Sequence, residues 1–395
     1  MSELASEPVT IAGGRSVLLA HGSAELYGSD RMVVESVAAM VDAGWRVVVT
    51  VPGEGPLLPA VRAAGARVAR CPVPVLRKAA LRPAGLARLA LDAARAVRPM
   101  LRLLRAERPD LIYVNTVTVP LWLPLARARR VPVLAHVHEA EEAVPAVVRV
   151  GLAAPLLAAG RVLVNSAATE ATLARALPPL RGRVRRIDNG VAGPARPLGP
   201  AATPREPARV LLVGRLSPRK GVDVAVDAVA LLRRAGRNVR LDVLGSVFPG
   251  YEWYERAVRD RITAAGLADA VRLRGFSADV WPAYADADLA VVPSRVEPFG
   301  NTAVEAQLAG VPVVVSDAQG LPETVGHGRH GLVVAAGDPA ALAGGIAAVL
   351  DDWPVARERA LAARAAAAER FAPRRYRQRV AAAVEELAGS RPAPQ

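Results

Sequence analysis

Hydrophobic residues along the first half of the chain fall into short apolar runs separated by longer amphipathic segments. The runs predict buried strands at residues 16–20, 46–51, 110–115, 131–137 and 161–165. The segments between them carry apolar residues at helical spacing, as in the long basic stretch 86–106. Strands that alternate with helices predict a parallel sheet covered on both faces.

The same alternation restarts in the second half, after a segment of different composition. Residues 190–207 contain five prolines, three glycines and no apolar run, which is typical of a linker. Strands then follow at 209–213, 239–244, 271–274, 289–292 and 311–315, with helices at 222–234, 251–265 and 302–309 and three more helical segments between 339 and 387. We predict an α/β protein with an N-terminal doubly wound domain at 1–195 and a C-terminal one at 196–372. A helix and frayed tail at 373–395 are expected to cross back to the first domain.

Composition limits the class of protein. A hydrophobic fraction of 52% and a single cysteine, Cys71, are expected of a globular chain without a disulfide framework. The N-terminus has no basic and apolar leader, and the apolar stretch 144–159 is interrupted by Arg149 and Pro155. We therefore expect a cytoplasmic protein.

Positive charge is concentrated in the first half. The net charge is +14, and twelve basic residues stand against two acidic ones between Arg62 and Arg108. This basic, amphipathic region predicts contact with an anionic membrane surface, so that the protein is peripheral at the inner face. The alternative is compositional, because only Lys78 and Lys220 among 51 basic residues are lysine. Nucleic acid is not expected as a partner, since aromatic residues make up only 4% of the chain.

Two segments of the second half have the chemistry of an anion site. The loop Gly214-Arg-Leu-Ser-Pro-Arg-Lys-Gly221 follows a predicted strand and leads into a helix, where backbone N–H groups bind phosphate, and Arg215 and Lys220 add positive charge. The alternative is a solvated turn. In the second segment, Gly300 and Asn301 begin a predicted helix.

Two glutamates flank that helix start. Glu305, one turn inside the helix, has the position to accept hydrogen bonds from ribose hydroxyls. Thr302 and Glu305 also fit a capping box, which would give Glu305 a purely structural role. The capping box leaves Glu297 unexplained.

These segments, with further motifs in the same order, resemble the retaining family 4 glycosyltransferases of the GT-B fold. The additional motifs are Asp188-Asn-Gly-Val191, Gly275-Phe276, the run from Ala287 to Ser294, Gly310-Val-Pro-Val-Val and Gly320-Leu-Pro-Glu-Thr-Val325. The resemblance is strongest over residues 188–335. It implies two Rossmann-like domains that face each other across a cleft, and a retaining enzyme with a nucleotide-diphosphate sugar as donor substrate.

The resemblance also implies roles for individual residues. Arg215 and Lys220 would bind the diphosphate and stabilise its departure, Glu305 would bind the ribose, and Glu297 would lie against the donor sugar. Gly214 belongs to the phosphate loop, Gly245 and Phe276 would approach the base, and Phe299, Gly300 and Asn301 would offer backbone donors.

In the first domain the resemblance implies roles for Gly28 and a histidine. Gly28 would let donor and acceptor approach, although Tyr27-Gly28 replaces the usual Gly-Gly. His138 would lie beside the reacting sugar carbon. We expect His136 and His138 to point to opposite faces of their strand, and His138 is favoured because it is nearer the strand end.

No metal or other cofactor is expected. Asp286-Ala-Asp288 has an Asp-x-Asp pattern but lies where a short helix meets a buried strand, so we reject a metal role for it. The predicted function is metal-independent transfer to the hydroxyl of a sugar, a lipid-linked or a small-molecule acceptor, with an envelope glycan or glycolipid as one option. The alternatives are an epimerase or phosphorylase of the same fold, or a non-catalytic membrane-associated scaffold. The nucleotide base stays open among UDP, GDP and ADP.

Overall fold

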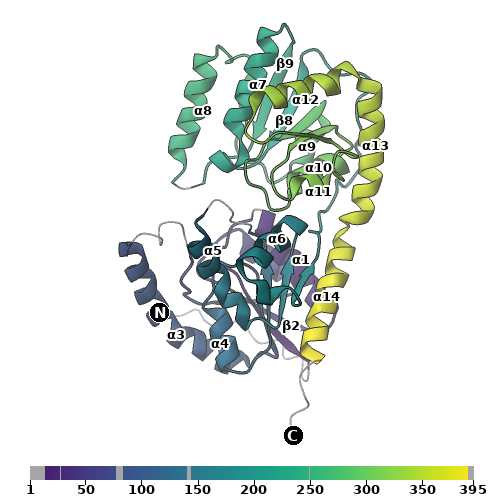
Figure 1. The fold of residues 1–395 in the computed structure, drawn as a ribbon. Helices are drawn as coiled ribbons and strands as arrows, with labels where there is room; N and C mark the ends of the chain where they lie inside the picture. Colours follow the sequence, from purple (N-terminus) through teal and green to yellow (C-terminus); the bar gives the residue numbers. More distant parts are fainter. Residues whose placement is uncertain (1–13, 27, 77–82, 140–143, 249, 390–395) are drawn as a thin grey trace. The chain divides into compact units, whose positions relative to one another are not determined.

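The chain forms two compact units in a computed structural model that describes residues 14–26, 28–76, 83–139, 144–248 and 250–389. The first unit contains the described residues of 1–164, 173–187 and 376–395, and the second contains those of 165–172 and 188–375. Both units are drawn in Figure 1. Each is built around one sheet.

The first unit is built on a parallel sheet of seven strands in the order β3-β2-β1-β4-β5-β6-β7. The strand bounds are β1 Ser16–Ala20, β2 Arg46–Val51, β3 Arg67–Arg70, β4 Leu111–Val114, β5 Val133–Val137, β6 Arg161–Val164 and β7 Val184–Arg186. The order reverses between β1 and β4, and ligands of such sheets bind beyond the carboxyl ends of the strands at this point.

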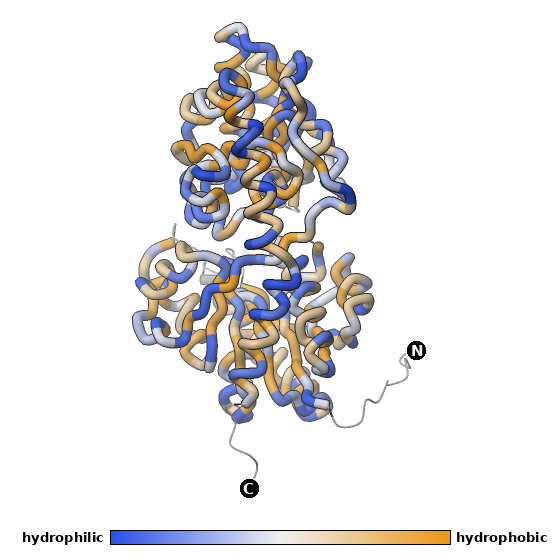
Figure 2. Tube along the Cα trace, turned by 90° about the vertical axis from the view of Figure 1, so that its right-hand side faces the viewer, coloured by the Kyte–Doolittle hydropathy of each residue, from blue (hydrophilic) through white to orange (hydrophobic). Residues whose placement is uncertain are grey.

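Helices cover both faces of this sheet. Their bounds are α1 Gly28–Asp42, α2 Leu57–Ala63, α3 Pro83–Glu107, α4 Trp122–Ala128, α5 Ala146–Ala153, α6 Ala167–Ala176 and α14 Pro373–Gly389, the last two being divided between the units. Within β1, Val17 and Leu19 pack in one core, and Leu18 and Ala20 pack in another. Figure 2, coloured by hydropathy, shows hydrophobic and hydrophilic stretches of the chain in both units. Burial on both faces explains why the strands read as continuous apolar runs.

The second unit has a parallel sheet of six strands in the order β10-β9-β8-β11-β12-β13. Its strands are β8 Ala208–Val213, β9 Val239–Leu244, β10 Val271–Leu273, β11 Leu289–Val292, β12 Val313–Ser316 and β13 Leu332–Val334. Its helices are α7 Val222–Arg234, α8 Glu252–Ala264, α9 Trp281–Ala285, α10 Asn301–Leu308, α11 Leu321–Thr324, α12 Pro339–Asp351 and α13 Trp353–Arg370. Here too the order reverses between β8 and β11, so the switch point repeats.

The prediction of two parallel, helix-covered sheets is confirmed. Three short strands were missed: β3, β7 and β13. Each lies at a sheet edge, and β3 and β7 each contain two arginines instead of forming an apolar run. A strand at the edge of a sheet has a neighbouring strand on one side only. Its sequence therefore shows a weaker pattern of apolar residues, which makes it hard to predict.

The last helix, α14, belongs to the core of the first unit. Val380, Ala383 and Val384 pack in the same cluster as β1 and β2, and the indole N–H of Trp45 donates to Glu385 Oε1 at 2.6 Å. Tyr376, 2% exposed, bonds to Ser36 Oγ of α1 at 2.7 Å. The first unit is therefore assembled from segments far apart in the sequence.

Candidate functional site

Three loops meet at the carboxyl edge of the second sheet. Gly214, after β8, donates its N–H to Leu244 O at 3.0 Å, and Gly245, after β9, donates to Gly275 O at 2.8 Å. A Cβ on Gly245 would lie 1.9 Å from Gly214 O, and its φ is +153°. Only glycine fits this position, so the loops after β8 and β9 can approach closely.

Lys220 and Glu297 form an ion pair at this edge. Lys220 Nζ contacts Glu297 Oε2, and the two side chains are 24% and 13% exposed. The ammonium carries three donors, so it has the capacity to hold Glu297 and an anion together. The sequence prediction put both residues at the donor site, and the structure brings them into contact.

The other predicted residues of these loops are more exposed. The Arg215 guanidinium lies 5.6 Å from the centre of the Phe248 ring, and Arg215 is exposed. Phe276 is 58% exposed, directly after the Gly245–Gly275 bridge. An exposed aromatic ring beside a phosphate-type loop is available to stack on a flat ligand.

The helix start at Gly300 corrects one sequence interpretation. Helix α10 begins at Asn301 with Gly300 as its N-cap residue, in a left-handed conformation with φ +107°. Thr302 is therefore already inside the helix, and no side chain caps its start. The capping box proposed for Thr302 and Glu305 is wrong, because the glycine begins the helix two residues earlier.

Glu305 is instead a buried carboxylate, 7% exposed, one turn inside α10. The Tyr284 hydroxyl lies 3.4 Å from Glu305 Oε2 and 3.0 Å from the carbonyl oxygen of Thr302. Burial, with the charge of Glu305, raises the pKa of Tyr284 well above its usual value, so Tyr284 stays a neutral donor.

Asn301 and Phe299 are fixed by residues that the sequence prediction did not assign to the site. Asn189 Nδ2 donates to Asn301 Oδ1 at 2.9 Å. The Phe299 ring is 3% exposed and meets Phe371 edge to face, with ring centres 5.7 Å apart. The side chain of Phe299 is thus part of the core, which leaves only its backbone for a ligand.

At the carboxyl edge of the first sheet, two histidine rings lie side by side. His136 is in β5 and His138 follows it, and their ring centres are 4.1 Å apart. The expectation of opposite faces is wrong, because residues two apart along a strand share one face. Burial lowers the pKa of His136 to about 3. Burial, and then the neighbouring histidines, lowers the pKa of His138 well below its usual value, so both rings are neutral near pH 7.

A chain of buried hydrogen bonds leads to His138 from helix α1. Asp30 Oδ1 lies 2.7 Å from His21 Nε2, and Asn115 Nδ2 lies 3.5 Å from His21 Nδ1. Asn115 Oδ1 lies 3.2 Å from His138 Nε2. Sequence reasoning missed Asp30, His21 and Asn115. His21 and Asn115 directly follow β1 and β4, and this position after a buried strand was the available signal.

Gly28, the remaining predicted residue of the first unit, is exposed and begins α1. It is two residues before Asp30, at the same switch between β1 and β4. Tyr27, its neighbour in the predicted loop, lies outside the described residues.

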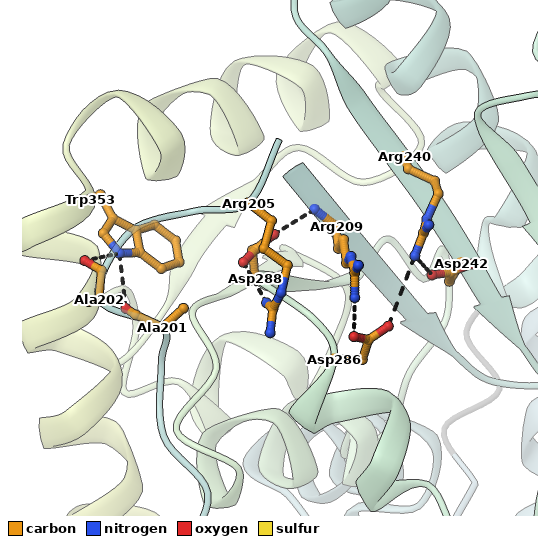
Figure 3. Close-up of polar contacts among 9 residues, drawn as sticks. All are labelled: Ala201, Ala202, Arg205, Arg209, Arg240, Asp242, Asp286, Asp288 and Trp353. Carbon is orange, nitrogen blue, oxygen red and sulfur yellow. Dashed lines mark hydrogen bonds and ion pairs between the residues drawn. The ribbon is translucent and has the colours of Figure 1, made fainter. Parts of the chain in front are cut away.

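The two aspartates of the Asp-x-Asp pattern lie at the opposite, amino edge of the second sheet (Figure 3). Asp288 Oδ1 accepts from Arg205 Nη1 at 2.8 Å, and Asp288 Oδ2 accepts from the Arg209 N–H at 2.7 Å. Asp286 contacts Arg209 and lies 4.0 Å from Arg240. Arginines and a backbone N–H thus bind these carboxylates, which gives the pattern a structural role.

Two family models match most of the chain between them. The model described as "Glycosyl transferase 4-like domain" matches residues 28–190, and "Glycosyl transferases group 1" matches residues 200–369. The matches divide the chain close to the proline-rich segment.

Curated relatives match in part. The glycogen synthase of Mycobacterium tuberculosis is 36% identical over 182 residues, which cover 45% of this chain and 42% of that protein. The lipopolysaccharide core biosynthesis mannosyltransferase LpsB of Rhizobium meliloti is 32% identical over 176 residues, covering 44% and 50%. The chain thus spans half or less of the length of these relatives.

Solved structures match over nearly the whole chain. Alr3699/HepE of Anabaena has a TM-score of 0.77 at 24% identity, covering 93% of this chain and 99% of that one. The sucrose-phosphate synthase of Thermosynechococcus elongatus has a TM-score of 0.75 at 22% identity, covering 95% and 100%. At these identities the likeness concerns the fold.

Proposed function

Because the chain belongs to the family 4-like glycosyltransferases of the GT-B fold, we propose that it moves a sugar from a nucleotide-diphosphate sugar to an acceptor hydroxyl. The observation that carries the proposal is the Lys220–Glu297 pair beside the tightly packed glycine loops of the second unit. A cation held by a carboxylate next to a phosphate-type loop suits a charged donor whose diphosphate leaves.

Lys220 and Arg215 would stabilise the negative charge that develops on the departing diphosphate. Lys220 is held in place by Glu297, which reduces the reorganisation needed when phosphate oxygens arrive. Arg215 is exposed and adds a second cation on the same loop. Glu297 would in turn face the donor sugar.

Glu305 would accept the two ribose hydroxyls of the nucleotide. It is buried, and the Tyr284 hydroxyl beside it donates toward Glu305 Oε2 at 3.4 Å. Gly300 and Asn301 would supply N–H groups at the start of the same helix. Phe276 and the Gly245 loop would lie against the base.

We further propose that transfer proceeds with retention at the sugar carbon and without a metal ion. Positive side chains and helix termini would then supply the electrostatic stabilisation. Two measurements test this: the anomeric configuration of the product by NMR, and the rate with and without EDTA. An inverted product, or a rate abolished by EDTA and restored by Mg²⁺, would contradict it.

A thermal-shift screen against UDP, GDP, ADP and their sugars tests the donor. UDP-glucose is the first probe, because the Anabaena structures of the same fold contain UDP, UDP-glucose, or UDP and glucose. One nucleotide should raise the melting temperature of the wild type and raise it much less in Lys220→Ala. No shift with any nucleotide would overturn the proposal and favour a non-catalytic scaffold.

An acceptor at an anionic membrane surface is favoured by helix α3. Arg88, Arg95, Arg98, Arg102 and Arg105 are exposed and follow one another at spacings of three, four or seven residues, so they share one face. Leu91, 50% exposed, lies on this face as well. None of the described helices is long and apolar enough to span a bilayer.

The membrane proposal is tested by sedimentation with phosphatidylglycerol vesicles, using phosphatidylcholine vesicles as the control. Replacing Arg95, Arg98 and Arg102 by glutamine should abolish binding to the anionic vesicles and leave nucleotide binding intact. Equal binding by the wild type and the variant would remove α3 from the proposal and favour the compositional origin of its arginines.

A further inference from the structure

The hydrogen-bond chain from Asp30 to His138 consists entirely of buried side chains. Asp30, His21, Asn115 and His138 are between 0% and 9% exposed. They come from helix α1 and from the ends of β1, β4 and β5, which lie next to one another in the sheet. Buried polar groups need partners, so each of these bonds constrains the next.

The direction of each bond follows from the chemistry of its ends. A carboxylate oxygen accepts a hydrogen bond from a ring N–H, so His21 Nε2 is the donor to Asp30 Oδ1 at 2.7 Å. The amide Nδ2 of Asn115 lies 3.5 Å from His21 Nδ1, and an amide nitrogen donates. The same amide turns Oδ1 toward His138. An amide oxygen only accepts, so His138 Nε2 carries the proton.

The consequence appears on the other nitrogen of His138. Because the ring is neutral and Nε2 holds the proton, Nδ1 is an unprotonated acceptor. This atom is buried and has no hydrogen-bond partner within the described part of the chain. A buried acceptor without a protein partner is a place where a ligand donor fits.

We propose that Asp30, His21 and Asn115 are positioning residues that fix His138 as the Nε2–H tautomer, so that Nδ1 accepts a hydrogen bond from a hydroxyl of the transferred sugar. The ligand class rests on the proposed function, whereas the tautomer does not. A lone pair at Nδ1 attracts a hydroxyl and repels phosphate oxygens. The first unit would thus distinguish the sugar from the diphosphate of one donor.

The second pair of buried groups nearby provides a matched control. Tyr113 OH lies 2.6 Å from His136 Nδ1 and 3.3 Å from Ser36 Oγ, and Ser36 bonds to Tyr376. Replacing Ser36 by alanine removes buried hydrogen bonds from the same core. It leaves every bond of the Asp30–His138 chain in place.

The test is ¹⁵N NMR of the histidine rings in the free protein, which has only five histidines. Wild type and Ser36→Ala should show His138 protonated at Nε2 alone. Asn115→Asp should keep this tautomer, because a carboxylate still accepts from Nε2. Asp30→Asn and Asn115→Leu should give a measurable fraction of the Nδ1–H form, since neither enforces the direction of the bonds.

Kinetics then connect the tautomer to transfer, with the nucleotide sugar identified in the thermal-shift screen as substrate. We expect kcat/KM to fall about 10- to 100-fold in Asn115→Leu and only a few-fold in Asn115→Asp. A wild-type His138 protonated at Nδ1, or a tautomer unchanged in both Asp30→Asn and Asn115→Leu, would overturn the positioning chain. Equal kcat/KM in Asn115→Leu and the wild type would overturn the role of Nδ1. Absence of any transfer in the wild type, with the tautomer as expected, would overturn the proposed function and leave the chain standing.

Discussion

The carboxyl edges of the two sheets occur at the same place in the topology and differ in their electrostatics. At the second sheet, Lys220, Glu297 and Arg215 carry full charges and are partly or fully exposed. At the first sheet, His136 and His138 are buried and neutral. One edge suits an anion, and the other suits a neutral ligand with hydroxyl groups.

Under the proposed function, this difference would divide the binding of a donor that carries both a diphosphate and a sugar. A diphosphate needs cations that retain access to it, whereas a sugar hydroxyl needs a donor or acceptor held in one direction. The charged side chains on the loops of the second unit would meet the first requirement, and the buried hydrogen-bonded network after the strands of the first unit would meet the second. The contrast can be tested by substitutions at each of the two edges.

The largest effect is expected for the charged edge. Lys220→Ala should lower kcat/KM by about 10²–10³, because a positioned donor to the leaving group is lost. The control is Arg237→Ala, which removes an exposed cation paired with Asp351 in the same unit. Steady-state kinetics check both variants, and comparable losses would mean that overall charge, and not the site, matters.

Gly245→Ala should disturb the loops at the carboxyl edge of the second sheet and destabilise the protein by about 3 kcal/mol. The added methyl group would meet the carbonyl oxygen of Gly214. Gly236→Ala is the matched control, because Gly236 also has a positive φ but has no atom within 4 Å of the added Cβ. Urea denaturation should show a loss of only about 1 kcal/mol for the control. Equal losses would show that backbone conformation alone requires the glycine.

Asp288→Ala separates stability from binding, because its network is at the opposite edge of the second sheet. The Asp288 side chain is 0% exposed and accepts from Arg205, so its loss should cost about 2 kcal/mol. The nucleotide dissociation constant should stay within about two-fold of the wild type. Asp286→Ala, at a side chain that is 45% exposed, should cost less. Weakened binding in Asp288→Ala would show that the two edges are coupled.

The buried, neutral histidines of the first sheet should make the stability of the protein depend on pH. The pKa values of His136 and His138 are lowered in the folded protein, so below about pH 6.5 protons bind the unfolded chain preferentially. Stability should fall as the pH drops from there, by about 1.4 kcal/mol per pH unit for each histidine. Burial raises the pKa of Glu139, which acts in the opposite sense and offsets part of the loss.

Urea denaturation between pH 7.5 and 5 measures this slope, and His136→Gln should reduce it. An unchanged slope in the variant would mean that His136 is not the buried neutral base that the structure places beside His138.

The cationic loop at the carboxyl edge of the second sheet could be predicted from the sequence, because its residues are close together along the chain. Lys220 lies in a glycine-bounded loop after an apolar strand, and its rarity in an arginine-rich chain singles it out. The ion pair with Glu297 required the topology, since β8 and β11 are neighbours in the sheet but distant in sequence. Gly300 shows the limit of local rules, because its left-handed conformation moved the helix start that Thr302 had predicted.

Most of the buried polar cluster at the carboxyl edge of the first sheet could not be predicted from the sequence. His21, Asn115 and His138 meet only because β4 pairs with β1 and with β5. No spacing within the sequence encodes that meeting, and each residue alone resembles an ordinary polar residue after a strand. The pairing of strands that are distant in the sequence therefore brings these residues together, and the periodicity of apolar residues does not predict it.

The position of α14 affects the order in which the protein takes shape during synthesis. The core of the first unit is incomplete until Val380, Ala383 and Val384 have left the ribosome, and Ser36 waits for the hydroxyl of Tyr376. The second unit, whose residues end at 375, has all its segments earlier. The half that is translated first is thus the half whose core is completed last.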